Sequence, residues 1–313
     1  MVRNGPSSDL SSAFPGEAEH PRAAMLDTYP AEEVVKLLVD EEGAALKTAK
    51  AAAAEIAAAS RLVAERLAGG GRLIFVGVGT AGRMAALEAA ECVPLYGLPP
   101  SLVVPVLAGG PHAMARTVEI SQDSRREAEQ RMRKAAVGPA DVVCAVADAE
   151  LSVFLLAAID YARFRRAKVV LVTCCEAPVA EDGGVLADIV VQLDPGPEII
   201  TGTSRSKAAT AIKVALSALG NAAFVQLGKT YGGLMVDVRP TTPRAWKRAI
   251  RIVSRLSHLD DADAEKLIKK AGGRAKVALV MHHTKVSPAR AKELLVQHRG
   301  SLRAIVGDLD LSG

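Results

Sequence analysis

Short apolar runs alternate with helix-forming segments through the middle of this chain. The runs are "LIFVG" from residue 73, "LVVPVL" from 102, "VVCAVA" from 142, "VVLVT" from 169 and "IVVQL" from 189. Continuous apolar runs are typical of strands buried on both faces, and the helices between them are the crossovers that parallel strands need. We therefore predict a doubly wound α/β fold, a three-layer arrangement with helices on both faces of a parallel sheet.

Segments on both sides of this region have helical spacing. Residues 26–68 carry apolar residues three or four apart and end in glycines, which predicts two amphipathic helices. Near the C-terminus, "AEKLIKKAGGRAKVALV" is followed by the similar "AKELLVQHRGSLRAIV", a repeat that predicts two helical hairpins. We expect three parts. They are a flexible tail over 1–25, an α/β domain with N-terminal helices over 26–255, and a small helical domain over 256–313.

Length and composition narrow the class of protein. A chain of 313 residues is long enough to bury a large core. Because no run of about 18 apolar residues is free of charge, a membrane-spanning helix is not expected. The first residues contain acids and prolines and lack a continuous apolar stretch, so a signal peptide is not expected either. We expect a cytoplasmic protein with no membrane partner.

Charge and residue types also disfavour some partners. The net charge of +4 comes from 39 basic and 35 acidic residues, and aromatic residues make up only 3%, so few side chains could stack on bases. The basic run "RPTTPRAWKRAIRIVSR" is better explained as a helix with a solvated basic face. No two cysteines have the C-x-x-C spacing of a zinc or redox site. We expect no nucleic-acid partner, no metal and no cofactor.

The segment "GVGTAGR" from Gly77 ends the first apolar run and begins a helix. In an open parallel sheet, ligands bind beyond the carboxyl ends of the strands, where helix N-termini present free N–H groups to anions. The letters also fit the dinucleotide pattern G-x-G-x-x-G. NAD binding is nevertheless disfavoured, because no acid ends the next strand to hold a ribose. The segment is therefore a candidate anion site, although a glycine-rich turn alone is weak evidence.

Two acids accompany this candidate site. Glu91 lies near the end of the helix that follows the glycine segment, and Glu119 lies in "GGPHAMARTVEISQDS". Two carboxylates near an anion-binding loop would suit general acid and base chemistry if burial raised the pKa of one of them. From spacing alone, a solvated carboxylate is the better explanation for each of them, and spacing does not show that they meet.

Four motifs, in this order, resemble those of the N-acetylmuramic acid 6-phosphate etherases, members of the sugar isomerase (SIS) domain group related to the glucokinase regulatory protein. The motifs are "GVGTAGRMAALEAAECVPLYG", "AGGPHAMARTVE", "ITGTSRSKAATAIK" and "LGKTYGGLMVDVRPT". The resemblance runs from about Leu26 to the end of the chain. It implies a flavodoxin-like three-layer α/β/α sandwich and a homodimer with sites at the subunit interface.

The same resemblance implies a lyase. Family enzymes remove D-lactate from the 3-position of N-acetylmuramic acid 6-phosphate by elimination and then add water, leaving N-acetylglucosamine 6-phosphate. On the matching motifs, Glu91 in "AAEC" is the acid that protonates the lactate oxygen, and Glu119 in "RTVE" is the base that removes the C2 proton. The expected substrate contacts are Gly79, Thr80, Ser152, Ser204 and Lys207, the last as a contact for an anion.

The phosphate-binding loops depart from the family pattern. Ala81 stands where the first loop usually has a serine. The second loop has Ala149, Glu150 and Leu151 where serine, glycine and arginine are expected. Ser152 keeps a hydroxyl, whereas Asp148 and Glu150 would repel a phosphate dianion. Each charge-assisted bond is worth roughly 1.5 to 3 kcal/mol, so the loss of several would lower phosphate affinity by orders of magnitude.

Two functions therefore stay open at this point. One is an etherase acting on the usual sugar phosphate or on a related ether. The other is a non-catalytic sensor of sugars or sugar phosphates, as the glucokinase regulatory protein is within the same group. In either case the apolar stretch "AATAIKVALSALGNAAFVQLG" predicts a homodimer surface, with burial in the chain's own core as the alternative.

Overall fold

The computed structural model describes residues 17–176 and 186–310. Its centre is a five-stranded sheet in the order β2-β1-β3-β4-β5, in which all neighbouring strands are parallel. The strands are β1 (Leu73–Gly77), β2 (Val103–Leu107), β3 (Val142–Ala147), β4 (Lys168–Thr173) and β5 (Ile189–Gln192). Each strand coincides with one of the five apolar runs. The predicted doubly wound α/β fold is therefore confirmed.

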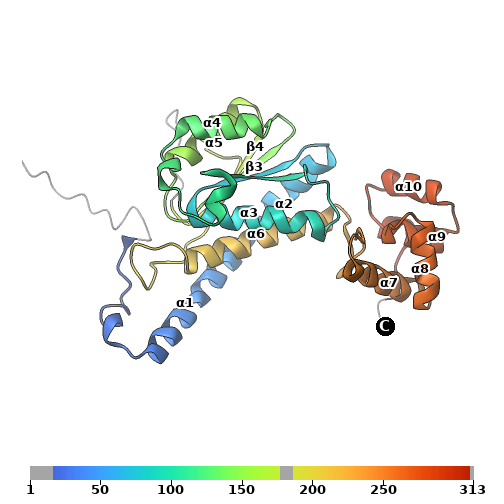
Figure 1. Cartoon of the computed structure of the whole chain (residues 1–313), viewed down its shortest axis with the longest axis horizontal. Coiled ribbons are helices and arrows are strands. Elements are labelled where there is room, and N and C mark those ends of the chain that lie inside the picture. Colours follow the sequence, from blue (N-terminus) through green and yellow to red (C-terminus); the bar gives the residue numbers. More distant parts are fainter. Residues whose placement is uncertain (1–16, 177–185, 311–313) are drawn as a thin grey trace, which may run out of the picture. The chain divides into compact units, whose positions relative to one another are not determined.

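Helices cover both faces of this sheet. They are α1 (Ala31–Ala51), α2 (Ala53–Ala68), α3 (Gly79–Leu95), α4 (Arg125–Lys134), α5 (Val153–Phe164) and α6 (Lys207–Gln226). In Figure 1, α4 and α5 lie on one side of the sheet, and α2, α3 and α6 lie on the other. Every residue of β1 and β3 is buried between these layers, as continuous apolar strands require.

Helix α6 contains the apolar stretch that was considered for a dimer surface. By length and composition this helix could cross a membrane, but 56% of the window that qualifies is buried inside the structure, as in a core helix. Ile212, Leu216, Leu219 and Phe224 of this helix are buried, whereas Val225 is exposed. Most of the stretch therefore belongs to the core of the chain, which was the alternative explanation.

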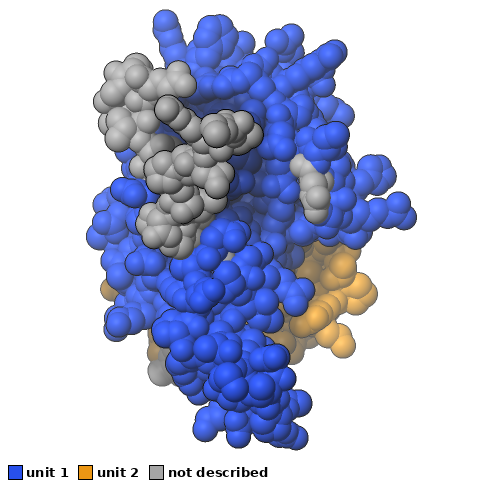
Figure 2. All heavy atoms as spheres, turned by 90° about the vertical axis from the view of Figure 1, so that its left-hand side faces the viewer, with its two compact units in different colours: residues 1–90, 103–220 blue, residues 91–102, 221–313 orange. Residues whose placement is uncertain are grey.

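The remaining elements are mostly helical. They are a hairpin of β6 (Thr230–Tyr231) and β7 (Leu234–Met235), followed by α7 (Pro243–Ser257), α8 (Asp261–Lys270), α9 (Ala275–Thr284), α10 (Pro288–Gln297) and α11 (Arg303–Val306). Contacts divide the chain into unit 1, residues 1–90 and 103–220, and unit 2, residues 91–102 and 221–313, coloured separately in Figure 2. The predicted domain boundary at residue 256 falls within α7 and stays a prediction.

The C-terminal sequence repeat forms two successive helix pairs. The first is α8 with α9, which pack against each other as a hairpin, and the second is α10 with the single-turn α11, each of which packs on α9. Gly273 and Gly300 occupy matching places before the second helix of each pair, with φ of +78° and +81°. Glycine adopts this left-handed conformation without strain. At Gly300 a Cβ would also lie only 3.2 Å from the carbonyl oxygen of Leu227, so a larger residue would crowd this turn.

Helix α7 confirms the interpretation of the basic run. Thr242 caps its N-terminus by accepting a hydrogen bond from the backbone N–H of Ala245 at 3.2 Å. One face packs into the core of unit 2 through Ala249, Ile252, Val253 and Leu256. The opposite face exposes Arg244, Lys247, Arg248 and Arg251. The positive charges therefore solubilise an amphipathic helix.

Candidate functional site

The strand order predicts a ligand site at the ends of β1 and β3. The chain crosses from β1 to β2 on one side and from β3 to β4 on the other, so the order reverses between β1 and β3. Open α/β sheets bind ligands beyond the carboxyl ends of the strands at such a switch point. The loops that border it are residues 77–82 and 148–152, which include several of the predicted substrate contacts.

The first loop is compact because glycines allow close packing. A Cβ on Gly77 would lie 2.7 Å from the Cα of Gly82, and one on Gly82 would lie 2.5 Å from the Leu107 side chain. Gly79 has φ of +52° and begins α3, so the chain turns from strand into helix within two residues. The first turn of α3, which contains Thr80 and Ala81, therefore faces the carboxyl end of the sheet.

Asp148 connects this loop to two other segments. It directly follows β3, and its Oδ2 accepts hydrogen bonds from the backbone N–H of Ala81 at 3.3 Å and from the Ser204 hydroxyl at 2.9 Å. Burial raises the pKa of the Asp148 carboxyl, and the bonds from Ser204 and the backbone oppose that rise. The structure thus joins the α3 N-terminus, the β3 loop and Ser204 around one carboxyl group.

Ser152 ends the second loop as the N-cap of α5. Its Oγ accepts a hydrogen bond from the backbone N–H of Leu155 at 3.2 Å, and the side chain is buried. A hydroxyl that accepts in this way can still donate its proton to a ligand. Thr80, in the first loop, is partly exposed. Ligand contacts at Gly79, Thr80, Ser152 and Ser204 stay predictions.

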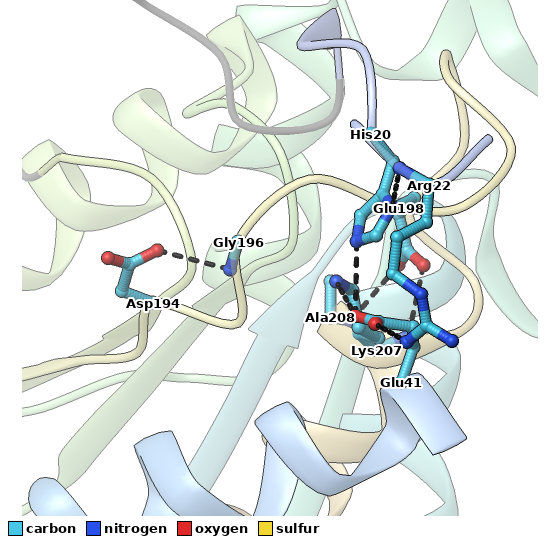
Figure 3. Close-up of polar contacts among 8 residues, drawn as sticks. All are labelled: His20, Arg22, Glu41, Asp194, Gly196, Glu198, Lys207 and Ala208. Carbon is cyan, nitrogen blue, oxygen red and sulfur yellow. Dashed lines mark hydrogen bonds and ion pairs between the residues drawn. The ribbon is translucent and has the colours of Figure 1, made fainter. Parts of the chain in front are cut away.

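Lys207 lies in a buried polar cluster at the start of α6 (Figure 3). The backbone N–H groups of Lys207 and Ala208 donate to the carboxylate of Glu198, both at 3.1 Å, which satisfies the helix N-terminus internally. The Lys207 Nζ donates to Oε2 of Glu41 at 3.2 Å, and its side chain is only 3% exposed. Its charge is therefore paired within the chain, and its role as an anion contact stays a prediction.

Glu41 also holds the segment that precedes α1. Its carboxylate bonds His20 Nε2 at 3.1 Å and accepts from Arg22 Nη1 at 2.9 Å. Burial would raise the pKa of Glu41, but the bond and charge of Lys207, with those of His20 and Arg22, hold it below its usual value. The described part of the predicted tail, residues 17–25, is thus bonded to α1, whereas residues 1–16 lie outside the described residues.

The two predicted catalytic acids lie in different units. Glu91 is in the last turns of α3, exposed, and belongs to unit 2. It lines a cavity of about 390 Å³ together with Arg239, Arg244 and Arg248. Glu119 begins the short 3₁₀ helix η5 (Glu119–Ser121) in unit 1, and its side chain lies outside the described part of the structure. The pairing of the two acids stays a prediction.

No protein-family model matches this chain, but curated relatives match nearly all of it. The N-acetylmuramic acid 6-phosphate etherase of Gloeothece citriformis is 37% identical over 288 residues, which cover 92% of this chain and 93% of the relative. The chain belongs to the N-acetylmuramic acid 6-phosphate etherase family. The etherase of Rubrobacter xylanophilus is 38% identical over 295 residues, covering 93% of this chain and 95% of the relative. The four motifs thus identified the family correctly.

Among solved structures, a phosphoheptose isomerase from Francisella tularensis is 15% identical, with a TM-score of 0.46. The match covers 63% of this chain and 99% of the isomerase chain. Membership of the etherase family therefore rests on the sequence relatives, and the geometry of the site rests on this chain's own residues.

Several residues of the site were missed from the sequence. From the sequence, Asp148 is only a charge that opposes phosphate, because its hydrogen bonds come from groups 67 and 56 residues away. Its place directly after an apolar strand was the available signal. Glu41 and Glu198 gave no signal at all, since their partners at the start of α6 are set by tertiary structure.

Proposed function

We propose that this protein is a carbon–oxygen lyase of the etherase type. It eliminates D-lactate from the 3-position of N-acetylmuramic acid 6-phosphate, or of the same lactyl ether without the phosphate, and leaves the corresponding N-acetylglucosamine. The observation that carries this proposal is the match to etherases over more than nine-tenths of the chain. The motifs with Glu91 and Glu119 lie within this matched length and supply an acid and a base.

The reaction follows from the acidity of the C2 proton. In the open-chain aldehyde, the carbonyl group stabilises the carbanion that forms when the Glu119 carboxylate removes that proton. The electron pair then forms the C2–C3 double bond as the C3–O bond breaks, and the Glu91 carboxylic acid protonates the departing lactate oxygen. Addition of water restores a hydroxyl at C3 and a hydrogen at C2. Each proton transfer is worth about 100- to 10,000-fold in rate.

A homodimer belongs to this proposal. Gly79 begins α3 and Glu91 lies twelve residues further along the same helix, about 18 Å at roughly 1.5 Å per residue. That is longer than one sugar ring, so an acid that acts on a sugar held at the α3 N-terminus would come from a second copy. Val35, Val39 and Leu46 lie on one face of α1 and are 59%, 65% and 58% exposed. This apolar face is a candidate surface for that copy.

The dimer has a direct test. We expect light scattering at micromolar concentration to give twice the mass of the chain, and Val39→Lys to shift the mass toward that of one chain. If the wild-type protein has the mass of one chain, the proposed dimer and the site shared between two copies are ruled out. The proposal also places the enzyme in the cytoplasm, as expected from the sequence.

A lactate assay tests the activity. Purified protein is incubated separately with N-acetylmuramic acid 6-phosphate and with N-acetylmuramic acid, and D-lactate release is measured beside an established family member. Release of lactate from either sugar supports the lyase. If neither sugar releases lactate while the relative is active, the lyase proposal is wrong. A ligand that stabilises the protein without being turned over would then favour the sensor.

A further inference from the structure

Unit 2 contains a cavity of about 320 Å³ that the proposed lyase reaction does not use. Its charged lining residues are Asp237, Arg274, Lys276, Lys292 and Arg299, which are four cations and one carboxylate. That carboxylate is already paired, because Asp237 accepts a hydrogen bond from Lys229 Nζ at 2.7 Å. The lining therefore carries an excess of positive charge.

Three of the four cations lie at the open side of the cavity. Arg274, Lys292 and Arg299 are exposed, and no carboxylate within residues 17–176 and 186–310 forms an ion pair with any of them. Like charges gathered around one cavity repel each other, and a bound anion relieves this repulsion. The lining thus favours an anion over a neutral molecule or a cation.

Lys276 brings a buried cation to the same cavity. Its side chain is 5% exposed, and its Nζ donates to the carbonyl oxygen of Gly228 at 2.6 Å. An ammonium group has three N–H donors, and Asp237, at 3.7 Å, is beyond hydrogen-bonding distance. Gly300 also lines the cavity, and a Cβ there would lie 3.5 Å from this Nζ, so glycine leaves space beside the ammonium group. Donors of Lys276 therefore remain for a bound anion.

The first turn of α9 adds to the positive potential. Arg274 is the N-cap of this helix and Lys276 lies two residues further on, although cations are unfavourable at the positive end of a helix dipole. In α7, α8 and α10 an N-cap side chain accepts a hydrogen bond from the backbone, whereas the N-cap of α9 makes no such bond. An anion in the cavity offsets the two charges and the uncapped N–H groups together.

We propose that this cavity binds a phosphate group, supplied either by inorganic phosphate or by a small phosphorylated metabolite. A dianion with three acceptor oxygens suits several cations at once. Leu295 and Val296 form an apolar wall on which the carbon part of a metabolite can pack. Burial lowers the pKa of Lys276, and a bound dianion would favour the charged form of this lysine. The site is additional to the lyase site and does not depend on the lyase proposal.

Isothermal titration with inorganic phosphate and with glucose 6-phosphate, at pH 7.5 and constant ionic strength, tests the site. We expect Lys276→Met, and the double substitution of Arg274→Gln with Arg299→Gln, each to lower affinity by about 10- to 100-fold, the range of one or two charge-assisted bonds. Two variants are used because Lys276→Met alters a buried side chain and could fold poorly. Tighter binding of glucose 6-phosphate indicates a metabolite, and tighter binding of inorganic phosphate indicates the free ion.

Arg290→Gln is the matched control. It removes an exposed arginine of α10 that is not among the residues lining the cavity, so it should bind both probes as the wild type does. A lyase that takes a sugar phosphate holds phosphate through other residues, so the sites per chain are also counted. The wild type should show one more site than the double variant, whether or not lactate is released. Equal binding by the wild type and both variants, or an equal loss in Arg290→Gln, would overturn the proposal.

The pH dependence of glucose 6-phosphate binding gives a second readout. The charged groups around Lys276 are Lys229 and Asp237 beside the β6–β7 hairpin, Arg274 before α9, Lys292 on α10 and Arg299 after α10. Among them, Lys276 is the group whose pKa burial lowers to about 8, so it loses its proton between pH 7.5 and 9.5. Affinity in the wild type should fall by about tenfold over this range, and Lys276→Met should show no such fall. Constant affinity in the wild type would contradict the proposal.

Discussion

Lys276 is a charged group in the core of unit 2, and its burial makes stability depend on pH. Its side chain is 5% exposed, and its Nζ donates to the carbonyl oxygen of Gly228 at 2.6 Å. The carboxylate of Asp237 lies 3.7 Å away but bonds Lys229 at 2.7 Å. Burial lowers the pKa of Lys276 to about 8, and the attraction of Asp237 offsets this only in part.

The sign and size of the effect follow from proton counting. An ordinary lysine has a pKa of 10.5, so between about pH 8 and 10.5 the unfolded chain binds a proton that the folded chain does not. The free energy of unfolding therefore rises with pH through this window. Below about pH 8, Lys276 is charged in the folded chain, and burial of this charge lowers stability by its full amount. At about 1.4 kcal/mol per pH unit, the lowered pKa corresponds to a cost of about 3 kcal/mol.

The test compares the wild type with Lys276→Met by urea unfolding at several pH values. Trp246 is the chain's single tryptophan and packs on the core of unit 2, so its fluorescence reports on the unit that contains Lys276. Between pH 7.5 and 10, the unfolding free energy of the wild type should rise by about 2 kcal/mol relative to the variant. Lys292 is exposed and lines one cavity with Lys276, so Lys292→Met should follow the wild type. Parallel pH curves for wild type and Lys276→Met would refute the reasoning.

Three further predictions concern the α/β core and the reaction. Asp141 is buried and accepts hydrogen bonds from Arg72 at 2.7 Å and from the backbone N–H of Gly138 at 2.9 Å. Asp141→Ala should therefore lower the free energy of unfolding in urea by about 3 to 5 kcal/mol. Asp160 forms an exposed ion pair, so Asp160→Ala should lower it by less than about 1 kcal/mol. Gly82→Ala places a Cβ 2.6 Å from a backbone carbon of β1. Thermal unfolding should therefore show a loss of about 1 to 3 kcal/mol in the free energy of unfolding. An unchanged melting temperature would contradict this packing. Glu91→Gln should abolish lactate release but still let bound product exchange its C2 hydrogen with solvent deuterium, because exchange needs only the base. Glu119→Gln should abolish both lactate release and exchange. Full lactate release and exchange in both variants would show that neither acid is catalytic.

The sequence by itself determined the elements of this protein. The five apolar runs became the five strands of the sheet, and the repeat near the C-terminus became two successive helix pairs with glycines at matching turns. These features depend on side chains within a few residues of each other, through periodicity and through the conformational freedom of glycine. The order of four motifs also determined the family. The rule that ligands bind beyond the carboxyl ends of parallel strands also marked the glycine segment 77–83 as a candidate anion site.

Only the tertiary structure decided what each charged group at that site does. Asp148 bonds Ser204 across 56 residues, and Lys207 bonds Glu41 across 166, so neither pairing has a local signal. The apolar sequence of α6 also left a dimer surface and a buried core as equal alternatives, and only the fold shows that most of its large apolar residues are buried. The physical reason is that the state of a charge depends on burial and on partners within a few ångströms, and the fold brings these from distant parts of the chain.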